Sequence, residues 1–231
     1  MERTAAVVLA AGKGSRMGST VHKQYMELSG KPLLYYTLKA FEESLVDDIV
    51  LVTGPGEVDF CQSEIIDRFG FQKITAVIEG GKERYHSVYA GLSAVKNCTY
   101  VLIHDGARPC VTKDIIDAAN EGAREYGACA VGMPVKDTIK ISDADGYAAV
   151  TPDRSSLWQI QTPQAFRFEL IAKAYQKLMA DEHFIKGITD DAMVVESMTK
   201  EKVKLIKGAY TNIKVTTPED LEIAELFLNR I

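Results

Sequence analysis

Short runs of β-branched and other apolar residues alternate with segments of helical period along most of this chain. Such alternation predicts right-handed strand–helix–strand crossovers and a mostly parallel sheet that helices cover on both faces. The fold class is therefore expected to be α/β. The expected strands are residues 5–9, 49–53, 74–78, 100–103 and 129–135. The first expected helix has Pro32 as its first residue, and three more span residues 57–69, 83–96 and 113–126. The final helix is expected to begin after Thr217, with Asp220 acting as a cap.

Composition narrows what the chain can bind. The 231 residues are 46% hydrophobic and 26% charged, which suits one globular domain, residues 1–231, with a sizeable core. A net charge of −5 disfavours a nucleic-acid coat and favours a small-molecule ligand. No apolar run reaches the length of a membrane span, and the beginning resembles a core strand more than a signal peptide. We therefore expect no membrane association and a cytoplasmic location.

The four cysteines and four histidines are not spaced as metal ligands. Cys61, Cys98, Cys110 and Cys129 form no C-x-x-C pair, and three of them have apolar or small neighbours. Buried reduced thiols are the expectation. The histidines also lack the short spacings of zinc ligands, so the sequence predicts no zinc site.

Residues 136–157 depart from this alternation. Ile139 and Ile141 lead to an Asp-Ala-Asp-Gly turn at 143–146, and residues 147–150 follow as a second short strand. The pattern is typical of a β-hairpin. A hairpin inserted in an α/β array cannot bury both faces against its own domain. We therefore expect a projecting arm that packs on another subunit of a homodimer.

The apolar run 5–11 leads directly into a turn with three glycines within residues 12–18. Without a Cβ in the way, backbone N–H groups can approach an anion closely, and Arg16 and Lys23 add full positive charges. This combination favours a triphosphate site. A dinucleotide-binding turn is the rival interpretation. It predicts an acidic residue at the end of the second strand, where this chain has Gly54-Pro55-Gly56.

Two further loops follow predicted strands. Gly81 permits close approach of a flat base, and Ser87 can hydrogen-bond its edge, although an ordinary glycine loop with an exposed serine remains an alternative. Asp105 follows the strand at 100–103 and is the predicted Mg²⁺ ligand, because Mg²⁺ on nucleotide phosphates takes only one or two protein carboxylates. Arg108 either compensates that charge or binds a phosphate.

The C-terminal third contains three weaker signals. Residues 153–164, which contain the only tryptophan, Trp158, are one candidate functional cluster. Alternatively, they serve only as a connection from the arm to the domain, with Trp158 packed at an interface. Thr189 or Asp190 is expected to cap a helix. Lys214 lies beside the start of the last helix, where a cation is unfavourable for the helix dipole, so binding of an anion is the expected duty.

Ordered motifs along nearly the whole chain point to one family. They are Leu9-Ala10-Ala11-Gly12-x-Gly14-x-Arg16-Met17, Lys23-Gln24-Tyr25, Glu83-Arg84-x-x-Ser87-Val88, His104-Asp105-Gly106-Ala107-Arg108-Pro109, Asp137-Thr138-Ile139-Lys140, Gln161-Thr162-Pro163-Gln164, Thr189-Asp190 and Asn212-Ile213-Lys214-Val215-Thr216. Together they resemble the 2-C-methyl-D-erythritol 4-phosphate cytidylyltransferases. The resemblance implies a Rossmann-like three-layer nucleotidyltransferase fold and a cytoplasmic homodimer with exchanged arms. It also implies synthesis of 4-diphosphocytidyl-2-C-methyl-D-erythritol from CTP in the non-mevalonate isoprenoid pathway.

The resemblance also implies roles for individual residues, with Arg16, Lys23, Arg154 and Lys214 as the catalytic set. Lys82 stands where some family members have an acidic residue, so its contact is assigned to the backbone. The implied nucleotide-binding residues are Ala10, Ala11, Gly12, Gly14, Arg16, Lys23, Gly81, Lys82 and Ser87, with Asp105 as the Mg²⁺ ligand. The implied substrate-binding residues are Arg108, Thr162, Thr189 and Lys214, joined by Thr138 and Arg154 from the partner's arm.

Two other functions remain open at this point. A cytidylyltransferase for another polyol phosphate, such as ribitol 5-phosphate, shares several motifs, but those relatives tend to have Ala-Gly-Gly at residues 10–12 and Val-Arg-Pro at residues 107–109. Both differences favour methylerythritol phosphate. A non-catalytic nucleotide-binding module is the more distant alternative, and it leaves Arg154 and Lys214 unexplained.

Overall fold

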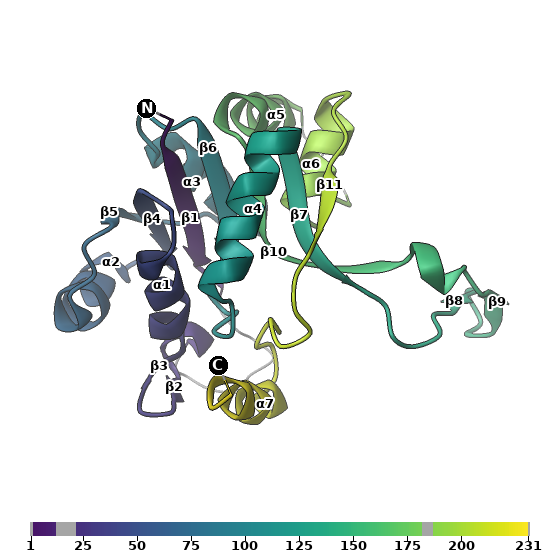
Figure 1. Ribbon diagram of the computed structural model, residues 1–231, viewed down its shortest axis with the longest axis horizontal. Coiled ribbons are helices and arrows are strands. Elements are labelled where there is room, and N and C mark those ends of the chain that lie inside the picture. Colours follow the sequence, from purple (N-terminus) through teal and green to yellow (C-terminus); the bar gives the residue numbers. More distant parts are fainter. Residues whose placement is uncertain (1, 13–21, 182–186, 231) are drawn as a thin grey trace.

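A mixed sheet organises the protein, whose computed structural model describes residues 2–12, 22–181 and 187–230. Within these residues the sheet has seven strands in the order β11-β7-β10-β6-β1-β4-β5 (Figure 1). The strands β6, β1, β4 and β5 run parallel, as do β7 and β11, whereas β10 is antiparallel to both of its neighbours. In chain order the strands are β1 (Thr4–Ala10), β4 (Asp48–Thr53), β5 (Ile74–Glu79), β6 (Tyr100–Asp105), β7 (Ala128–Pro134), β10 (Trp158–Arg167) and β11 (Lys204–Lys207).

Helices form a layer on each face of this sheet. One buried cluster joins α1, the π-helical η3 and α4 to one face, and a second joins α3, α5 and α6 to the other. The predicted α/β class and three-layer architecture are therefore confirmed. The helices are α1 (Leu33–Glu43), α2 (Val58–Phe60), η3 (Cys61–Asp67), α3 (Arg84–Ala94), α4 (Lys113–Tyr126), α5 (Phe168–Ala180) and α6 (Asp191–Met198).

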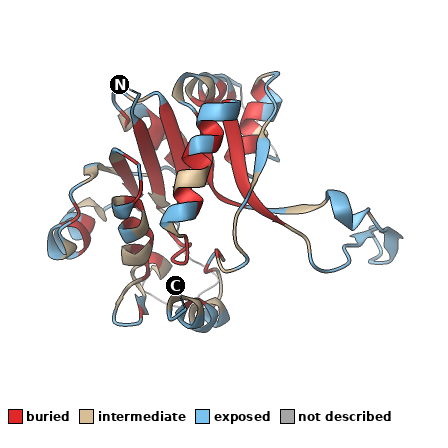
Figure 2. Ribbon diagram, viewed as in Figure 1, coloured by how far each residue is buried: buried red, intermediate tan, exposed pale blue. Residues whose placement is uncertain are grey.

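The position of β1 between two helical layers explains why its sequence is apolar from Ala5 to Ala10. Ala6 and Val8 lie in the cluster with α1 and α4, while Ala5 and Val7 lie in the cluster with α3 and α5. Successive side chains of a strand point to opposite faces, so a strand covered on both sides needs apolar residues at every position. Figure 2 shows this buried sheet in red between its helical layers.

The predicted hairpin is present and projects from the body of the protein (Figure 1). Its strands are β8 (Ile141–Ser142) and β9 (Ala148–Val150), and Gly146 adopts a φ of +87° in the connecting turn. A short 3₁₀ helix, η4 (Arg154–Ser156), leads back to β10. Almost all of the arm is exposed in the single chain (Figure 2).

A small third cluster joins the C-terminal helix α7 (Pro218–Leu228) to a short hairpin near the start of the chain. The Asp220 carboxylate accepts hydrogen bonds from the Thr216 and Thr217 N–H groups at 2.7 and 2.9 Å, which confirms its predicted role as a cap. The remaining elements are η2 (Lys23–Tyr25), β2 (Glu27–Leu28) and β3 (Lys31–Pro32).

Three expectations about elements need correction. Residues 57–69 do not form one regular helix, because α2 passes into the π-helical η3. Pro32 precedes α1 and is not its first helical residue. Residues 153–164 are more than a connection: β10 is an interior strand of the sheet, and α5 and β11 also lay outside the predicted set. The glutamines of β10 concealed it, because they break the apolar pattern by which buried strands are recognised.

The cysteines behave largely as expected. All four are free thiols; Cys61, Cys110 and Cys129 are buried, and Cys98 is partly exposed. Burial raises the pKa of Cys61 and Cys98 to about 11 and that of Cys110 and Cys129 to about 12. In the described part of the chain, no helix has the length and apolar content needed to cross a membrane.

Gly91 allows α3 to pack closely on β1, which gives a test of the core. A Cβ at this position would lie 2.4 Å from Val7 Cγ1 and 3.1 Å from Val52 Cγ2. Alanine normally stabilises a helix relative to glycine by up to about 1 kcal/mol. We expect Gly91→Ala instead to lower the free energy of unfolding by about 1–3 kcal/mol through overpacking, measured by urea denaturation. The exposed Ser93→Ala serves as the control, and a more stable Gly91→Ala protein would contradict this packing.

Candidate active site

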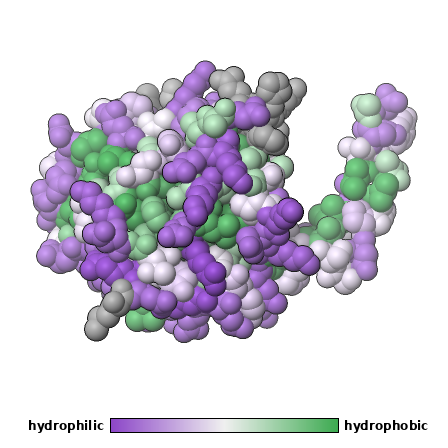
Figure 3. All heavy atoms as spheres, turned by 90° about the horizontal axis from the view of Figure 1, so that it is seen from above, coloured by the Kyte–Doolittle hydropathy of each residue, from purple (hydrophilic) through white to green (hydrophobic). Residues whose placement is uncertain are grey.

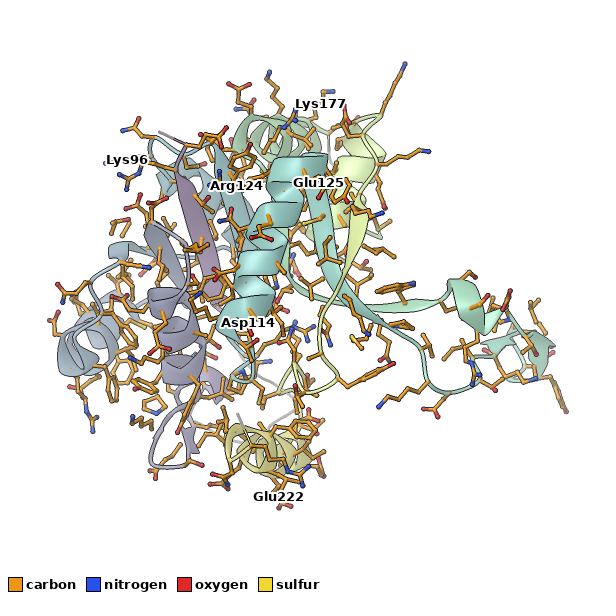
Figure 4. The ribbon with its side chains drawn as sticks, viewed as in Figure 1. Lys96, Asp114, Arg124, Glu125, Lys177 and Glu222 are labelled. Carbon is orange, nitrogen blue, oxygen red and sulfur yellow. The ribbon has the colours of Figure 1, made fainter. Side chains whose placement is uncertain are left out.

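A cavity of about 770 Å³ opens at the carboxyl ends of β1 and β6, the end at which open parallel sheets bind ligands. Lys96 and Arg124 mark the opposite end of the sheet in Figure 4. A second cavity, of about 450 Å³, lies at that opposite end beside Arg3 and Asp48, and its lining includes none of the predicted site residues. The predicted residues that line the larger cavity are Ala10, Ala11, Gly12, Lys23, Gly81, Lys82, Ser87, Asp105 and Lys214.

Asp105, the last residue of β6, supplies a buried carboxylate to this cavity. Lys214 Nζ lies 2.8 Å from Asp105 Oδ2, Arg84 Nε lies 3.4 Å from Oδ1, and Arg108 Nε lies 3.9 Å from Oδ2. Burial acts to raise the pKa of Asp105, but these three cations, Arg84 foremost, outweigh it and hold the pKa well below its usual range. The carboxylate is therefore ionised at neutral pH.

Arg84 and Asp191 belong to the same network, although the sequence analysis gave them no role. Arg84 donates from Nη1 and Nη2 to the two oxygens of Asp191 at 2.8 and 2.7 Å. Asp191 is fully buried, and the Tyr175 hydroxyl donates to its Oδ1 at 2.6 Å. The adjacent Asp190 caps α6 by accepting the Met193 N–H. The consecutive aspartates 190 and 191 were the sequence signal for this ion pair. A helix cap needs one carboxylate, so the second aspartate required another partner.

The loop after β5 packs tightly against the end of β1. A Cβ on Gly80 would lie 2.6 Å from both Ala11 Cβ and Ser87 Oγ, so only glycine fits without displacement. The Gly81 N–H donates to Ser87 Oγ at 3.1 Å, and Ser87 is buried at the first turn of α3. Lys82 is exposed at the rim. This loop forms the wall of the cavity that faces the end of β1.

The segment after the glycine turn carries Lys23 into the cavity. Lys23 Nζ donates to the Val215 carbonyl at 3.0 Å, and Gln24 Nε2 donates to the Ala10 carbonyl at 2.6 Å. Gln24 was not among the predicted site residues. Gly14 and Arg16, both predicted to bind nucleotide, lie outside the described residues.

Beneath Asp105, β10 brings Thr162 to the site. The Asp105 N–H donates to Thr162 Oγ1 at 3.1 Å, and His104 Nδ1 lies 3.1 Å from the same oxygen. Arg108 is buried and donates from Nη1 to the Asn212 carbonyl at 2.7 Å. These contacts bring the end of β6, the middle of β10 and the segment before α7 together.

The other predicted substrate residues are more dispersed. Thr189 is exposed just before the cap of α6. Thr138 and Arg154 are exposed on the projecting arm, where Arg154 Nη1 donates to the Lys136 carbonyl at 2.9 Å. Neither arm residue is among those that line the cavity of its own chain.

A three-layer α/β fold with a glycine-lined, cation-rich cavity at the carboxyl ends of its strands is typical of enzymes that bind nucleotides, nucleotidyltransferases among them. Comparison with known proteins identifies the family. The family model described as 2-C-methyl-D-erythritol 4-phosphate cytidylyltransferase matches residues 4–230, and the chain belongs to this family.

Individual relatives agree with this assignment. The chain is 54% identical over 224 residues to a protein of that name from Lachnospira eligens, covering 96% of this chain and 98% of the relative. It is 51% identical over 228 residues to one from Lachnoclostridium phytofermentans, covering 99% and 97%. The crystal structure of 4-diphosphocytidyl-2C-methyl-D-erythritol synthase from Anaerococcus prevotii has a TM-score of 0.86 at 33% identity and covers 99% of each chain. The resemblance inferred from the motifs is thus confirmed.

His104 gives a pH-dependent test of the packing beneath the site. Burial lowers the pKa of His104 from 6.5 to about 3, so the unfolded chain binds a proton between these values that the folded chain does not. His104 therefore contributes stability that is complete above pH 6.5 and is lost as the pH falls toward 3. Relative to His104→Gln, we expect the unsubstituted protein to lose about 1.4 kcal/mol of unfolding free energy per pH unit between pH 5.5 and 4.5. Urea denaturation at each pH measures this difference, and parallel pH profiles would contradict a neutral buried His104.

Proposed function

We propose that this protein transfers a cytidylyl group from CTP to 2-C-methyl-D-erythritol 4-phosphate, which gives 4-diphosphocytidyl-2-C-methyl-D-erythritol and pyrophosphate. Relatives that match almost the whole chain carry the name of this activity. The observation that carries the proposal is the ionised Asp105 in a glycine-lined cavity that also presents Lys23, Arg84 and Lys214. Two phosphate-bearing substrates repel each other, and cations gathered at one cavity offset that repulsion.

The nucleotide is assigned to the loops after β1 and β5. Backbone N–H groups next to glycine can approach phosphates closely, and the Ser87 hydroxyl lies where it can meet a base or ribose. Lys82 would contribute through its backbone. The triphosphate is assigned to Ala10, Ala11, Gly12, Gly14, Arg16 and Lys23, and the cytidine to Gly81, Lys82 and Ser87.

Asp105 is the residue that would hold Mg²⁺. An ionised carboxylate that lines the cavity fits this ion, which takes one or two protein carboxylates when it also binds nucleotide phosphates. Among the described residues, no group of three or more His, Cys, Asp and Glu side chains could hold a metal ion by itself, so phosphate oxygens and water would complete the shell. When bound, the ion would neutralise part of the negative charge on the phosphates.

The reaction then follows from positioning and charge. An oxygen of the methylerythritol phosphate attacks the α-phosphorus of CTP in line, and pyrophosphate leaves. A phosphate monoester is already nucleophilic near neutral pH, so no general base is needed. Arg16 and Lys23 stabilise the negative charge on the α-phosphate and the leaving group, whereas Lys214, together with Arg154 of the partner subunit, orients the attacking phosphate.

The substrate side requires a second subunit. Arg108, Thr162, Thr189 and Lys214 are assigned to methylerythritol phosphate in one chain, joined by Thr138 of the partner subunit and Arg154 of the partner subunit. The arm supports a homodimer because it exposes large apolar side chains (Figure 3), which water solvates poorly. These side chains are Ile139, Ile141, Tyr147 and Val150.

The four free thiols support a location in the cytoplasm. Disulfides form and persist in oxidising compartments, and reducing compartments keep thiols free. CTP and a phosphorylated polyol would meet the enzyme there.

Pyrophosphate release provides the direct test of the activity. With CTP, Mg²⁺ and 2-C-methyl-D-erythritol 4-phosphate we expect turnover, and with ribitol 5-phosphate in its place a kcat/KM at least about 100-fold lower, since unpaired polar groups at a specific site are costly. Exclusive turnover of ribitol 5-phosphate would overturn the substrate assignment. Binding of CTP without turnover of either substrate would indicate a nucleotide-binding module.

Lys23→Ala tests the proposed charge stabilisation. Loss of a preorganised cation at the reacting phosphate is expected to lower kcat by about 10²-fold or more. Steady-state pyrophosphate release measures the effect, with the exposed Lys39→Ala on α1 as the control. A near-normal kcat for Lys23→Ala would remove this lysine from the mechanism.

Charges on the arm test the dimer. We expect Ile141→Asp combined with Tyr147→Asp to shift the protein from dimer to monomer in sedimentation velocity, because an apolar contact face would then bury charge. Activity should fall with dimer content, since each site would lose Arg154 of the partner subunit. Ala144→Asp in the exposed turn is the control. An unsubstituted protein that sediments as a monomer would refute the arm assignment.

A further inference from the structure

The carboxylate of Glu57 joins two segments at the edge of the cavity. The Tyr25 hydroxyl donates to Glu57 Oε2 at 2.7 Å, and the Gly54 N–H donates to the same oxygen at 2.9 Å. His22 Nδ1 contacts the other oxygen, Oε1. The side chain of Glu57 is only 14% exposed, so these partners replace most of its contact with water. One carboxylate therefore holds both ends of the short segment from His22 to Tyr25.

That segment cannot hold itself in place. Its helix η2 has three residues and no side-chain cap, which is too short to be stable alone. Outside contacts fix it: Gln24 bonds the Ala10 carbonyl, and the Tyr25 ring packs edge-on against Phe60 at 4.9 Å between centroids. Glu57 bonds Tyr25 and contacts His22 while it also accepts the Gly54 N–H, so it attaches both ends of this segment to the turn after β4.

Lys23 lies between the two residues that Glu57 holds. Its ammonium group lines the cavity and donates to the Val215 carbonyl at 3.0 Å. We infer that Glu57 is a positioning residue for Lys23, setting where its ammonium group meets the triphosphate without touching the nucleotide itself. This inference rests on the proposed function, in which Lys23 stabilises the reacting phosphates. A displacement of about 1 Å at such a group can cost up to about 10²-fold in rate.

The chain offers a matched control in Glu79. Its carboxylate accepts the Gly56 N–H at 2.7 Å, so it also bonds the turn after β4. That hydrogen bond ends in the turn itself and does not involve η2. Glu79→Ala therefore removes a carboxylate from the same turn without releasing Lys23.

The experiment is a double-mutant cycle between Glu57 and Lys23. For each protein, steady-state pyrophosphate release is measured as a function of CTP concentration, and thermal unfolding is recorded. Glu57→Ala is expected to lower kcat by about 10-fold or more. In the Lys23→Ala background the same substitution should change kcat less than about twofold, because the group that it positions is already gone. Glu79→Ala should also change kcat less than about twofold, and Glu57→Gln, which can still accept from Tyr25 and Gly54, should restore most of the lost kcat.

Each other outcome counts against the inference in a distinct way. If Glu57→Ala lowers kcat equally with and without Lys23, Glu57 acts through general stability. If Glu57→Ala changes kcat as little as Glu79→Ala does, the contacts of Glu57 with His22 and Tyr25 are irrelevant to the reaction. Normal kcat in Lys23→Ala would overturn the assigned role of Lys23 and this inference with it, while turnover by the unsubstituted protein would still test the proposed function separately. If Glu57→Ala does not fold, Tyr25→Phe replaces it in the cycle, since it removes one hydroxyl and keeps the ring against Phe60.

Discussion

The ionised carboxylate of Asp105 is the constraint around which the site is built. A buried anion is costly unless cations and donors surround it. Here the cations come from the first residue of α3, from the loop after β6 and from the segment before α7. Two of these cations have a second partner: Arg84 pairs with Asp191, and Arg108 donates to the Asn212 carbonyl. Compensation of one charge therefore joins segments that are far apart in the chain.

The position of β10 makes that arrangement possible. An antiparallel strand between β6 and β7 carries Thr162 beneath Asp105 and Gln164 toward the start of α6. Gln161 and Gln164 of this strand are buried, yet they find partners: Gln161 bonds the Ala209 carbonyl, and Gln164 bonds the Ala192 N–H. Buried polar groups of this kind fix one arrangement, because any shift in register would leave them unpaired.

Apolar periodicity and capping chemistry were enough to predict most of the central strands and several of the helices. The strands around β1 and the helix α4 follow their patterns, and Asp190 and Asp220 cap the starts of α6 and α7. The predictions were wrong where local pattern and tertiary environment diverge. The glutamines of β10 suggest a surface segment, but partners distant in sequence satisfy Gln161 and Gln164 inside the protein.

The candidate site divides in the same way. Glycines after strands, a carboxylate at the end of β6 and a lysine before the last helix are local signals. Such signals are enough to infer the fold class, the loops that line the cavity and the family. Three contacts become visible only in the folded protein: Arg84 pairs with Asp191, Lys214 lies against Asp105, and Glu57 holds the segment that carries Lys23. Ion pairs and hydrogen bonds between segments depend on distances in space, which no local spacing of residues encodes.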